Sequence, residues 1–181
     1  MQAMSKDSDG NYFQRLHGLD IRTGEELFGG PVDIAATYSG FGSETVFDPK
    51  PQFDRAGLVL QDGVIYTCWS SFCDQNTYHG WVIGYDTSLN QVRVVNLTPN
   101  GEEGSIWASG AAPAADSNGN LFLMTANGTF DTVLDSNGFP VQGDFGNCFV
   151  NLGPGTNGNL SVSDYFAPFN TVEESAMDFD L

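Results

Sequence analysis

Four side chains combine ligand-recognising chemistry with positions beside the starts of expected strands: Arg55, His79, Trp107 and Ser109. Arg55 lies just before the run GLVLQDG, and Trp107 and Ser109 lie just before GAAPAAD. A guanidinium group and an indole ring together suit a polar or carbohydrate-like ligand, because one donates hydrogen bonds and the other offers an apolar face. We therefore treat these four as candidate binding residues. The alternative is that Trp107 packs inside the core.

His79 lies close to Cys73 and Asp74 in the stretch CDQNTYHGW. Thiolate, imidazole and carboxylate groups are ligands of soft divalent metals. Only three such groups are local, whereas a structural zinc site takes four ligands, so we predict no metal site. The residues favour the alternative that His79 forms a hydrogen bond at a strand edge while Trp81 is buried.

The three cysteines of the chain allow one short disulfide loop. Cys68 and Cys73 are near enough in sequence to pair if the strand geometry permits. The alternative is that all three cysteines, Cys148 included, are small buried apolar side chains.

No sequence pattern supports a catalytic centre. A glycine-rich phosphate loop before a helix and a G-x-S-x-G elbow are both missing from the sequence. Glu102 and Glu103 are adjacent, and adjacent side chains of an extended chain point to opposite faces, which makes a poor general acid and base pair. We therefore predict no catalytic residue and expect a binding protein rather than an enzyme.

The charge balance excludes two classes of partner. Six Lys and Arg residues stand against 23 Asp and Glu residues, which gives a net charge of −17. Such a chain repels the phosphates of nucleic acid and of anionic lipid. The sequence also has no apolar run long enough to span a membrane. We expect neither a nucleic-acid partner nor a membrane span.

The elements that must position the candidate residues are β-strands. Short runs of alternating apolar and polar residues recur along the chain, and no segment keeps a helical spacing for three turns. Asp62-Gly63 and Asn118-Gly119 separate pairs of such runs, and both dipeptides are typical of tight hairpin turns. The sequence therefore predicts an all-β protein built from antiparallel hairpins.

Similar hairpins recur in the same order. Leu19 in HGLDIRTGEELF matches Tyr85 in IGYDTSLNQVRVV, and Leu152 in FVNLGPGTNGNLSV follows Tyr85 after nearly the same interval. The hairpin around Gly63 has its counterpart around Gly119, after a somewhat shorter interval. Two half-units that repeat in order predict four-stranded antiparallel units in tandem, as in the blades of a β-propeller.

We expect an incomplete propeller of about two and a half blades. Its parts are the later strands of one blade in residues 1–34, a second blade in 55–99, a third blade in 108–170 and the approach to a further blade in 171–181. The segments 35–54, 100–107 and 130–147 are insertions between strands, where binding function is more often found than on strands. The alternative is that they are variable surface loops.

The stretch LHGLDIRTGEELFGG, residues 16–30, resembles the pyrroloquinoline-quinone-type propeller repeat. The pattern is occupied by Gly18, Asp20, Thr23, Gly24 and Glu25. Phe28 stands where the family has a docking tryptophan. A second copy in residues 82–95 keeps Asp86 but lacks the Thr-Gly pair.

Three further segments, CDQNTYHGWVIGYD, GSIWASGAAPAADSNGNLFLMTANGTFD and DYFAPFN, resemble those of secreted or periplasmic proteins that carry this repeat. The resemblance implies an extracellular or periplasmic location. In the quinoprotein dehydrogenases of the family, the repeat encloses pyrroloquinoline quinone and calcium beside a disulfide between adjacent cysteines. This sequence has no adjacent cysteines, so we predict no cofactor.

We therefore expect an exported propeller scaffold, without enzymatic activity, that binds a protein or a glycan through its loops and channel mouth. We also expect further blades of the same polypeptide to complete it. The alternative is a segment of a quinoprotein-type oxidoreductase whose catalytic residues lie outside this chain and which binds pyrroloquinoline quinone with calcium.

Overall fold

The computed structural model describes residues 1–155 and 158–179, and its regular secondary structure is almost entirely β-strand. Within these residues, the elements are β1 (Gln2–Lys6), β2 (Tyr12–Leu16), β3 (Val32–Asp33), β4 (Thr37–Ser39), β5 (Glu44–Val46), β6 (Gln52–Phe53), β7 (Val59–Gln61), β8 (Val64–Cys68), β9 (Ser70–Ser71), β10 (Trp81–Asp86), β11 (Gln91–Asn96), β12 (Ala114–Ala115), β13 (Leu121–Met124), β14 (Phe149–Pro154), β15 (Leu160–Phe166) and α1 (Thr171–Ala176). The prediction of an all-β chain is confirmed. No described helix is long and apolar enough to cross a membrane.

Two four-stranded antiparallel sheets form the centre of the molecule. The middle sheet has the order β11-β10-β8-β7, and the C-terminal sheet has the order β12-β13-β14-β15. Each is a meander whose strands pair in chain order, and short turns connect most of them. Strand β9, which lies between β8 and β10 in the chain, pairs with β6 instead. The described strands otherwise form one three-stranded and two two-stranded sheets, and none of these sheets closes into a barrel.

The two four-stranded sheets share one register. In the middle sheet Tyr85 pairs with Ile65, and in the C-terminal sheet Leu152 pairs with Leu121. The intervals from Tyr85 to Leu152 and from Ile65 to Leu121 are the same as those between the matching hairpins of the sequence repeat. A bulge lies directly before Tyr85 in one sheet and directly before Leu152 in the other. The sequence repeat is therefore also a repeat of strand pairing.

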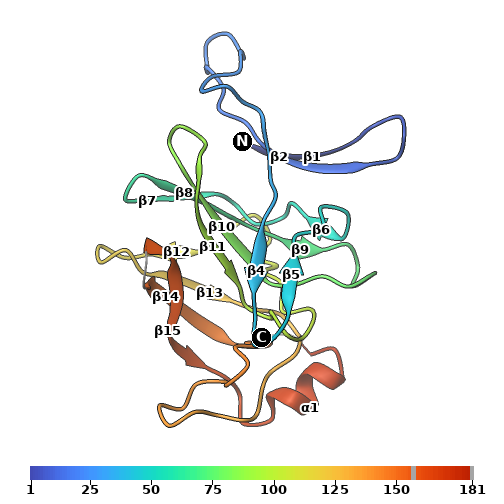
Figure 1. Cartoon of the computed structure of the whole chain (residues 1–181), viewed down its shortest axis with the longest axis vertical. Helices are drawn as coiled ribbons and strands as arrows, with labels where there is room; N and C mark the ends of the chain where they lie inside the picture. Colours follow the sequence, from blue (N-terminus) through green and yellow to red (C-terminus); the bar gives the residue numbers. More distant parts are fainter. Residues whose placement is uncertain (156–157, 180–181) are drawn as a thin grey trace.

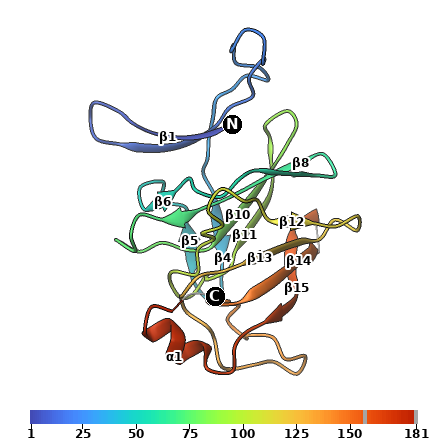
Figure 2. The same ribbon diagram turned by 180° about the vertical axis from the view of Figure 1, so that it is seen from behind.

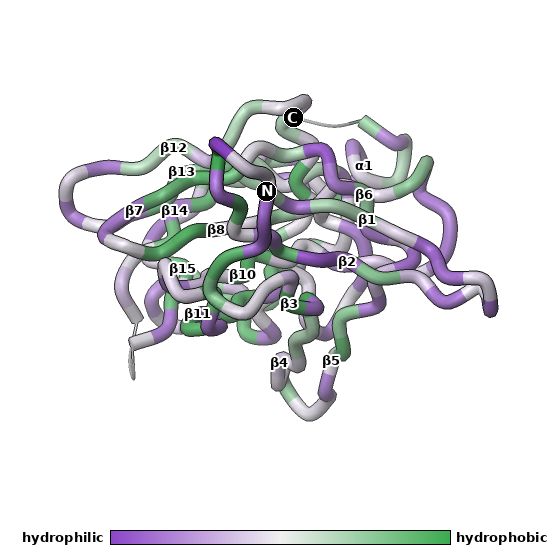
Figure 3. The backbone as a smooth tube through the Cα atoms, turned by 90° about the horizontal axis from the view of Figure 1, so that it is seen from above, coloured by the Kyte–Doolittle hydropathy of each residue, from purple (hydrophilic) through white to green (hydrophobic). Residues whose placement is uncertain are grey.

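The sheets lie in layers, with β1 and β2 at one end of the molecule and the C-terminal sheet and α1 at the other (Figure 1; Figure 2 shows the reverse side). The middle sheet lies between two clusters of buried apolar side chains. One of its faces packs on the C-terminal sheet through a cluster that includes Tyr66, Val82, Leu121 and Leu152. Figure 3 shows hydrophobic residues along β8 and β13, two strands that contribute to this cluster.

The other face of the middle sheet packs on the N-terminal third of the chain. Trp69, Trp81 and Ile83 are completely buried there, together with Leu16 and Phe47. The ring of Phe47 lies 4.8 Å from that of Trp69 and 5.8 Å from that of Trp81, measured between centroids. Phe47 belongs to the expected insertion 35–54, which contains the hairpin β4-β5 and strand β6. This insertion is therefore part of the core as well as a connection between strands.

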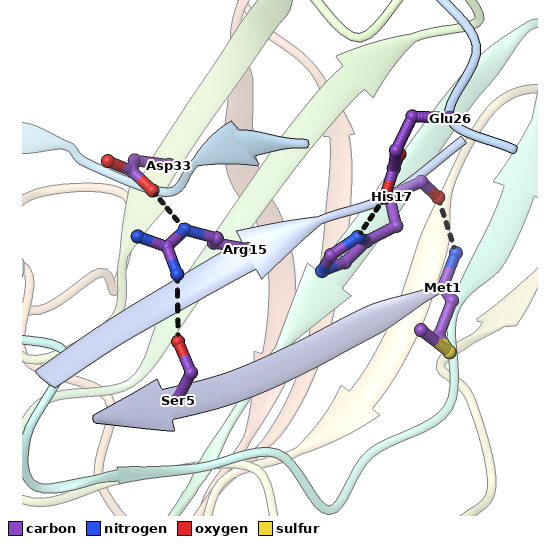
Figure 4. Close-up of polar contacts among 6 residues, drawn as sticks. All are labelled: Met1, Ser5, Arg15, His17, Glu26 and Asp33. Carbon is purple, nitrogen blue, oxygen red and sulfur yellow. Dashed lines mark hydrogen bonds and ion pairs between the residues drawn. The ribbon is translucent and has the colours of Figure 1, made fainter. Parts of the chain in front are cut away.

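The N-terminal sheet β1-β2-β3 is held by polar contacts on its exposed side (Figure 4). Arg15 on β2 donates from Nε to Asp33 on β3 at 2.7 Å and from Nη1 to Ser5 on β1 at 2.9 Å. His17 contacts the carboxylate of Glu26 at 2.5 Å. These contacts connect all three strands where few apolar side chains are available.

Aspartates close several of the turns in one recurring way. In the turn between β10 and β11, Asp86 accepts hydrogen bonds from the main-chain nitrogens of Ser88 and Asn90 and from the side chain of Asn90. The turns that begin at Asp7 and Asp116 repeat this arrangement. The side-chain hydrogen bond from Asn90, followed by the backbone hydrogen bonds, lowers the pKa of Asp86. The carboxylates of DSDGN and DSNGN therefore serve turn geometry.

Four glycines bring main chains into direct contact between the middle and C-terminal sheets. A Cβ atom on Gly80 would lie 2.2 Å from the carbonyl oxygen of Gly104, and one on Gly128 would lie 2.3 Å from the nitrogen of Gly104. A Cβ atom on Gly146 would lie 2.3 Å from the carbonyl carbon of Gly128. We call Gly80, Gly104, Gly128 and Gly146 the glycine stack. Hydrogen bonds such as Gly104 N to Asn127 O, 2.8 Å, run beside it.

The C-terminal segment contains the one short helix among the described residues. This helix, α1, has Glu173 and Glu174 in its first turn. Ser175 of α1 donates to the carbonyl of Gly128 at 2.9 Å and accepts from its nitrogen at 2.7 Å. The helix is thus attached to the glycine stack at Gly128. Residues 180 and 181 lie outside the described residues.

Candidate functional site

Main-chain hydrogen bonds place Arg55 beside the loop that carries Trp107 and Ser109. Arg55 lies between β6 and β7, and the loop lies between β11 and β12. The nitrogen of Gly110 donates to the carbonyl of Arg55 at 2.9 Å, and that of Gly57 donates to the carbonyl of Ala111 at 2.9 Å. Two segments that are far apart in the sequence are thus held side by side.

The side chains of these segments meet at the surface. The guanidinium of Arg55 lies 5.3 Å from the centroid of the Trp107 ring, and its Nη2 donates to Ser109 Oγ at 2.9 Å. Arg55 and Ser109 are exposed and Trp107 is half-buried. An arginine over an aromatic face is attracted by the negative ring quadrupole. Among the described residues, no carboxylate lies within ion-pair distance of Arg55. Its remaining N–H donors therefore face solvent.

The loop presenting Ser109 has an unusual backbone. Ala108, Ser109 and Gly110 follow one another with φ of 32°, 47° and 87°. Left-handed conformations of residues other than glycine cost about 1–3 kcal/mol each and often occur at ligand-binding positions. The hydrogen bonds of Gly110 and Ala111 hold this loop in place.

A concave pocket of about 380 Å³ adjoins Trp107, between the loop and β13. Its lining includes Trp107, Pro113, Met124 and Thr125 and is mainly apolar. Small-molecule sites are typically clefts of about 300–1,000 Å³ with a few polar groups at an apolar wall. The volume therefore accommodates a ligand of the size of one or two sugar rings.

A buried thiol lies behind this surface. Burial raises the pKa of Asp54, the neighbour of Arg55. Burial, and then the nearby charge of Asp54, raises the pKa of Cys68 to about 12. A thiol with such a pKa stays protonated at neutral pH and does not act as a nucleophile.

The structure places His79 in another group of residues. Its Nδ1 lies 2.9 Å from the carbonyl oxygen of Thr98, and its main chain forms a bridge with Glu103. Of the four candidate residues, Arg55, Trp107 and Ser109 therefore come together, and the contacts of His79 lie elsewhere.

Cys73 and Asp74 have separate surroundings as well. Cys73 is exposed, and Asp74 accepts hydrogen bonds from Ser71 Oγ, at 2.7 Å, and from the hydroxyl of Tyr78. Within the described part of the chain, no three His, Cys, Asp or Glu side chains are grouped to hold a metal ion.

The disulfide between Cys68 and Cys73 is not formed. All three cysteines are free, with Cys68 and Cys148 buried and Cys73 exposed. The physical reason is that β8 directs Cys68 into the core, whereas Cys73 lies in an exposed connection after β9.

Sequence reasoning missed two buried carboxylates. Asp144 accepts from the nitrogens of Asn100 and Gly101, at 2.9 and 3.1 Å, and Asp131 accepts from that of Gln142 at 2.6 Å. Their role is to hold loops together, and their partners lie up to 44 residues away. No local pattern could have indicated them.

Comparison of the chain with models of protein families, with curated proteins and with solved structures finds no match.

Proposed function

We propose that the chain is a binding scaffold without enzymatic activity, built as an incomplete β-propeller of the pyrroloquinoline-quinone-type repeat and exported from the cell. The propeller interpretation is supported by two four-stranded meanders with the same strand order, register and bulge position. It is also supported by their face-to-face packing, since propeller blades are four-stranded sheets repeated around an axis.

We propose a glycan as the ligand, bound on the surface formed by Arg55, Trp107 and Ser109. The observation that carries this proposal is the arginine held at the Trp107 ring by Ser109, with donors left over for a ligand. Sugars present hydroxyl groups at their edges and C–H groups on their faces. Guanidinium donors suit the edges and an indole ring suits the faces. A neutral glycan also avoids the repulsion that a net charge of −17 imposes on polyanions.

The three tryptophans make the test selective. Trp69 and Trp81 are 0% exposed, so acrylamide in solution quenches chiefly Trp107. We would titrate the chain with neutral hexasaccharides of glucose and of xylose and measure acrylamide quenching. We expect at least one of them to protect Trp107 saturably, with a dissociation constant on the order of 1 mM or below.

Variants separate this site from nonspecific protection. Arg55→Ala should weaken binding of the protecting sugar by at least about tenfold, because it removes the donors beside Trp107. The control is Arg22→Ala, which removes an exposed arginine paired with Asp20 far from the pocket lining. Failure of every hexasaccharide, or equal binding by Arg55→Ala and the unchanged chain, would contradict a glycan site here.

A further inference from the structure

The pocket beside Trp107 continues onto the outer face of the C-terminal sheet, the face turned away from the middle sheet. Phe122 and Met124 of β13 line that pocket, and both also line a second hollow of about 430 Å³. This second hollow extends across β14 and β15, where Phe149 and Phe166 belong to its lining. The two hollows therefore form one surface, which begins at Trp107 and reaches Phe166.

The strand register arranges the outer face in two adjacent rows. Phe149 on β14 pairs with Met124 on β13 and with Phe166 on β15, which makes an apolar row across the three strands. Beside it lies a mixed row, whose members also pair across the same strands: Phe122, Asn151 and Asp164. We call the residues of these two rows the platform.

The side chains of the apolar row are open to solvent. Met124, Phe149 and Phe166 are 41%, 46% and 62% exposed. The rings of Phe149 and Phe166 lie 6.2 Å apart between centroids, so they form one continuous apolar surface. Contiguous apolar surface of this kind commonly marks a binding site.

The mixed row places hydrogen-bonding groups next to this apolar surface. The side-chain oxygen of Asn151 has no hydrogen-bond partner among the described residues. One carboxylate oxygen of Asp164 accepts from the main-chain nitrogen of Tyr165 at 2.8 Å. Within the described part of the chain, Asp164 forms no ion pair. Both side chains thus have capacity left for hydrogen bonds to a ligand.

The equivalent face of the middle sheet, which the C-terminal sheet covers, is built differently. When the sheets are aligned by the repeat, Gly84 stands in place of Asn151. A Cβ atom on Gly84 would lie 2.9 Å from the ring of Tyr66, so that position has no room for a side chain. A sheet packed in the same way on the platform would bury the polar groups of Asn151 and Asp164, which costs free energy unless they are paired. A ligand that brings hydroxyl groups avoids this cost.

We propose that the platform extends the glycan site, so that the ligand is a linear, neutral polysaccharide of β-linked sugar rings that runs from Trp107 to Phe166. This inference rests on the glycan site proposed above. The C–H faces of successive rings lie on the apolar row, and their hydroxyl groups reach Asn151 and Asp164 in the mixed row. The chain is neutral because Asp164 and a net charge of −17 repel a polyanion.

The length of the sugar tests the platform separately from the pocket at Trp107. We would compare the disaccharide with the hexasaccharide, in whichever of the glucose and xylose series protects Trp107 from acrylamide. The pocket has the size of one or two rings, so the disaccharide fills it and the hexasaccharide also reaches the platform. We expect the hexasaccharide to bind at least about tenfold more tightly.

Phe149→Ala, and independently Phe166→Ala, should remove most of this advantage. Neither side chain lines the pocket at Trp107. Each variant should therefore bind the hexasaccharide at least about fivefold more weakly and the disaccharide within about twofold of the unchanged chain. Circular dichroism melts report whether the variants fold, and if one unfolds, the other carries the test. Phe41→Ala is the matched control, because Phe41 is 69% exposed and lines neither hollow.

Equal binding of the two sugars, or unchanged hexasaccharide binding by both variants, would overturn the platform and leave the pocket at Trp107 in place. Failure of the glycan site itself gives a different result, in which no hexasaccharide protects Trp107 or Arg55→Ala binds as the unchanged chain does; that result would overturn both proposals. Sedimentation velocity detects a competing occupant. Self-association that Phe149→Ala abolishes and the hexasaccharide leaves intact would mean that a protein surface covers the platform, and would overturn the proposal.

Discussion

Adding one methyl group to a residue of the glycine stack tests how closely the main chains of the two four-stranded sheets approach each other. In Gly128→Ala, the new Cβ atom would lie 2.3 Å from the nitrogen of Gly104, 2.8 Å from its Cα atom and 3.0 Å from the carbonyl carbon of Glu103. All three neighbours are main-chain atoms, so no side-chain rotation relieves the contact. The φ angle of Gly128 lies outside the left-handed region, so alanine itself fits the backbone there.

The size of the effect follows from opposing contributions. Overpacking of a rigid site costs about 1–3 kcal/mol, and separating the two main chains weakens the Gly104–Asn127 hydrogen bond, worth about 1 kcal/mol. Alanine also lowers the conformational entropy of the unfolded chain, which stabilises the folded state by about 0.4–1 kcal/mol. Since no neighbouring side chain can rotate away, the upper part of the overpacking range applies, and we expect a net loss of about 2–3.5 kcal/mol. For a chain of this length, that corresponds to a decrease in Tm of roughly 4–14 °C.

Urea unfolding, followed by circular dichroism, measures this loss. The control is Gly138→Ala, where a Cβ atom meets nothing within 4 Å and the cost comes from the φ of +85° alone. That cost is about 1–2 kcal/mol. If Gly128→Ala lowers the free energy of unfolding by less than Gly138→Ala does, the close approach of the main chains at the stack is wrong.

Four other predictions concern burial, charge and cofactor. Phe47→Ala should cost about 3–5 kcal/mol because this ring packs on two buried tryptophans, whereas Phe41→Ala, at a 69% exposed residue, should cost under about 1 kcal/mol; urea midpoints distinguish them. Burial raises the pKa of Asp144 above the ordinary value of 3.8. The folded chain therefore binds a proton at this carboxyl more tightly than the unfolded chain does, and stability is lost as the pH rises above 3.8. Asp144→Asn should therefore gain stability relative to the unchanged chain between about pH 4 and pH 7, and equal pH profiles would contradict this. Iodoacetamide should label Cys73 in the folded chain and Cys68 only after unfolding, as read by mass spectrometry; protection of Cys73 would indicate that it is paired after all. Finally, we expect no saturable fluorescence change when pyrroloquinoline quinone and calcium are added, and such a change at micromolar quinone would favour the oxidoreductase alternative.

The sequence predicts most accurately what depends on neighbouring residues. The turns at Asp62-Gly63 and Asn118-Gly119 connect paired strands, because these residues favour the required backbone angles whatever surrounds them. The interval between Tyr85 and Leu152 in the sequence repeat is also the interval between equivalent strand pairs of the two sheets. Short connections account for four of the six strand pairs in the two meanders, whereas β8–β10 and β13–β14 pair across longer segments.

Long-range packing was not predictable in the same way. Nothing near Phe47 in the sequence indicates that it contacts Trp69 and Trp81, so the sequence predicts for its segment only an insertion between strands. The C-terminal residues lack a clear helical period, yet Ser175 and its neighbours form α1 because they contact Gly128 across the fold. Such contacts depend on residues that are distant in the chain.

The candidate site shows the same difference between what local sequence patterns predict and what long-range packing decides. Arg55, Trp107 and Ser109 share the start of equivalent strands, a position that the repeat indicates, and they meet in the structure. His79 was grouped with them on the same argument. Its ring instead contacts the carbonyl of Thr98, a main-chain group that no side-chain pattern reveals.

The layered packing described above has a consequence for how stability is distributed. Among the described residues, the middle sheet is packed on both faces, on the N-terminal third of the chain and on the C-terminal sheet, as the middle unit of a short one-dimensional array is. Local opening should start at the ends, at β1-β2 and at β15, without disturbing β10. The amide protons of β10, whose residues are buried from Trp81 to Tyr85, then exchange with solvent only when the whole molecule unfolds. Hydrogen exchange at β10 therefore measures the global free energy of unfolding, whereas exchange at β1-β2 and at β15 measures the free energy of local opening.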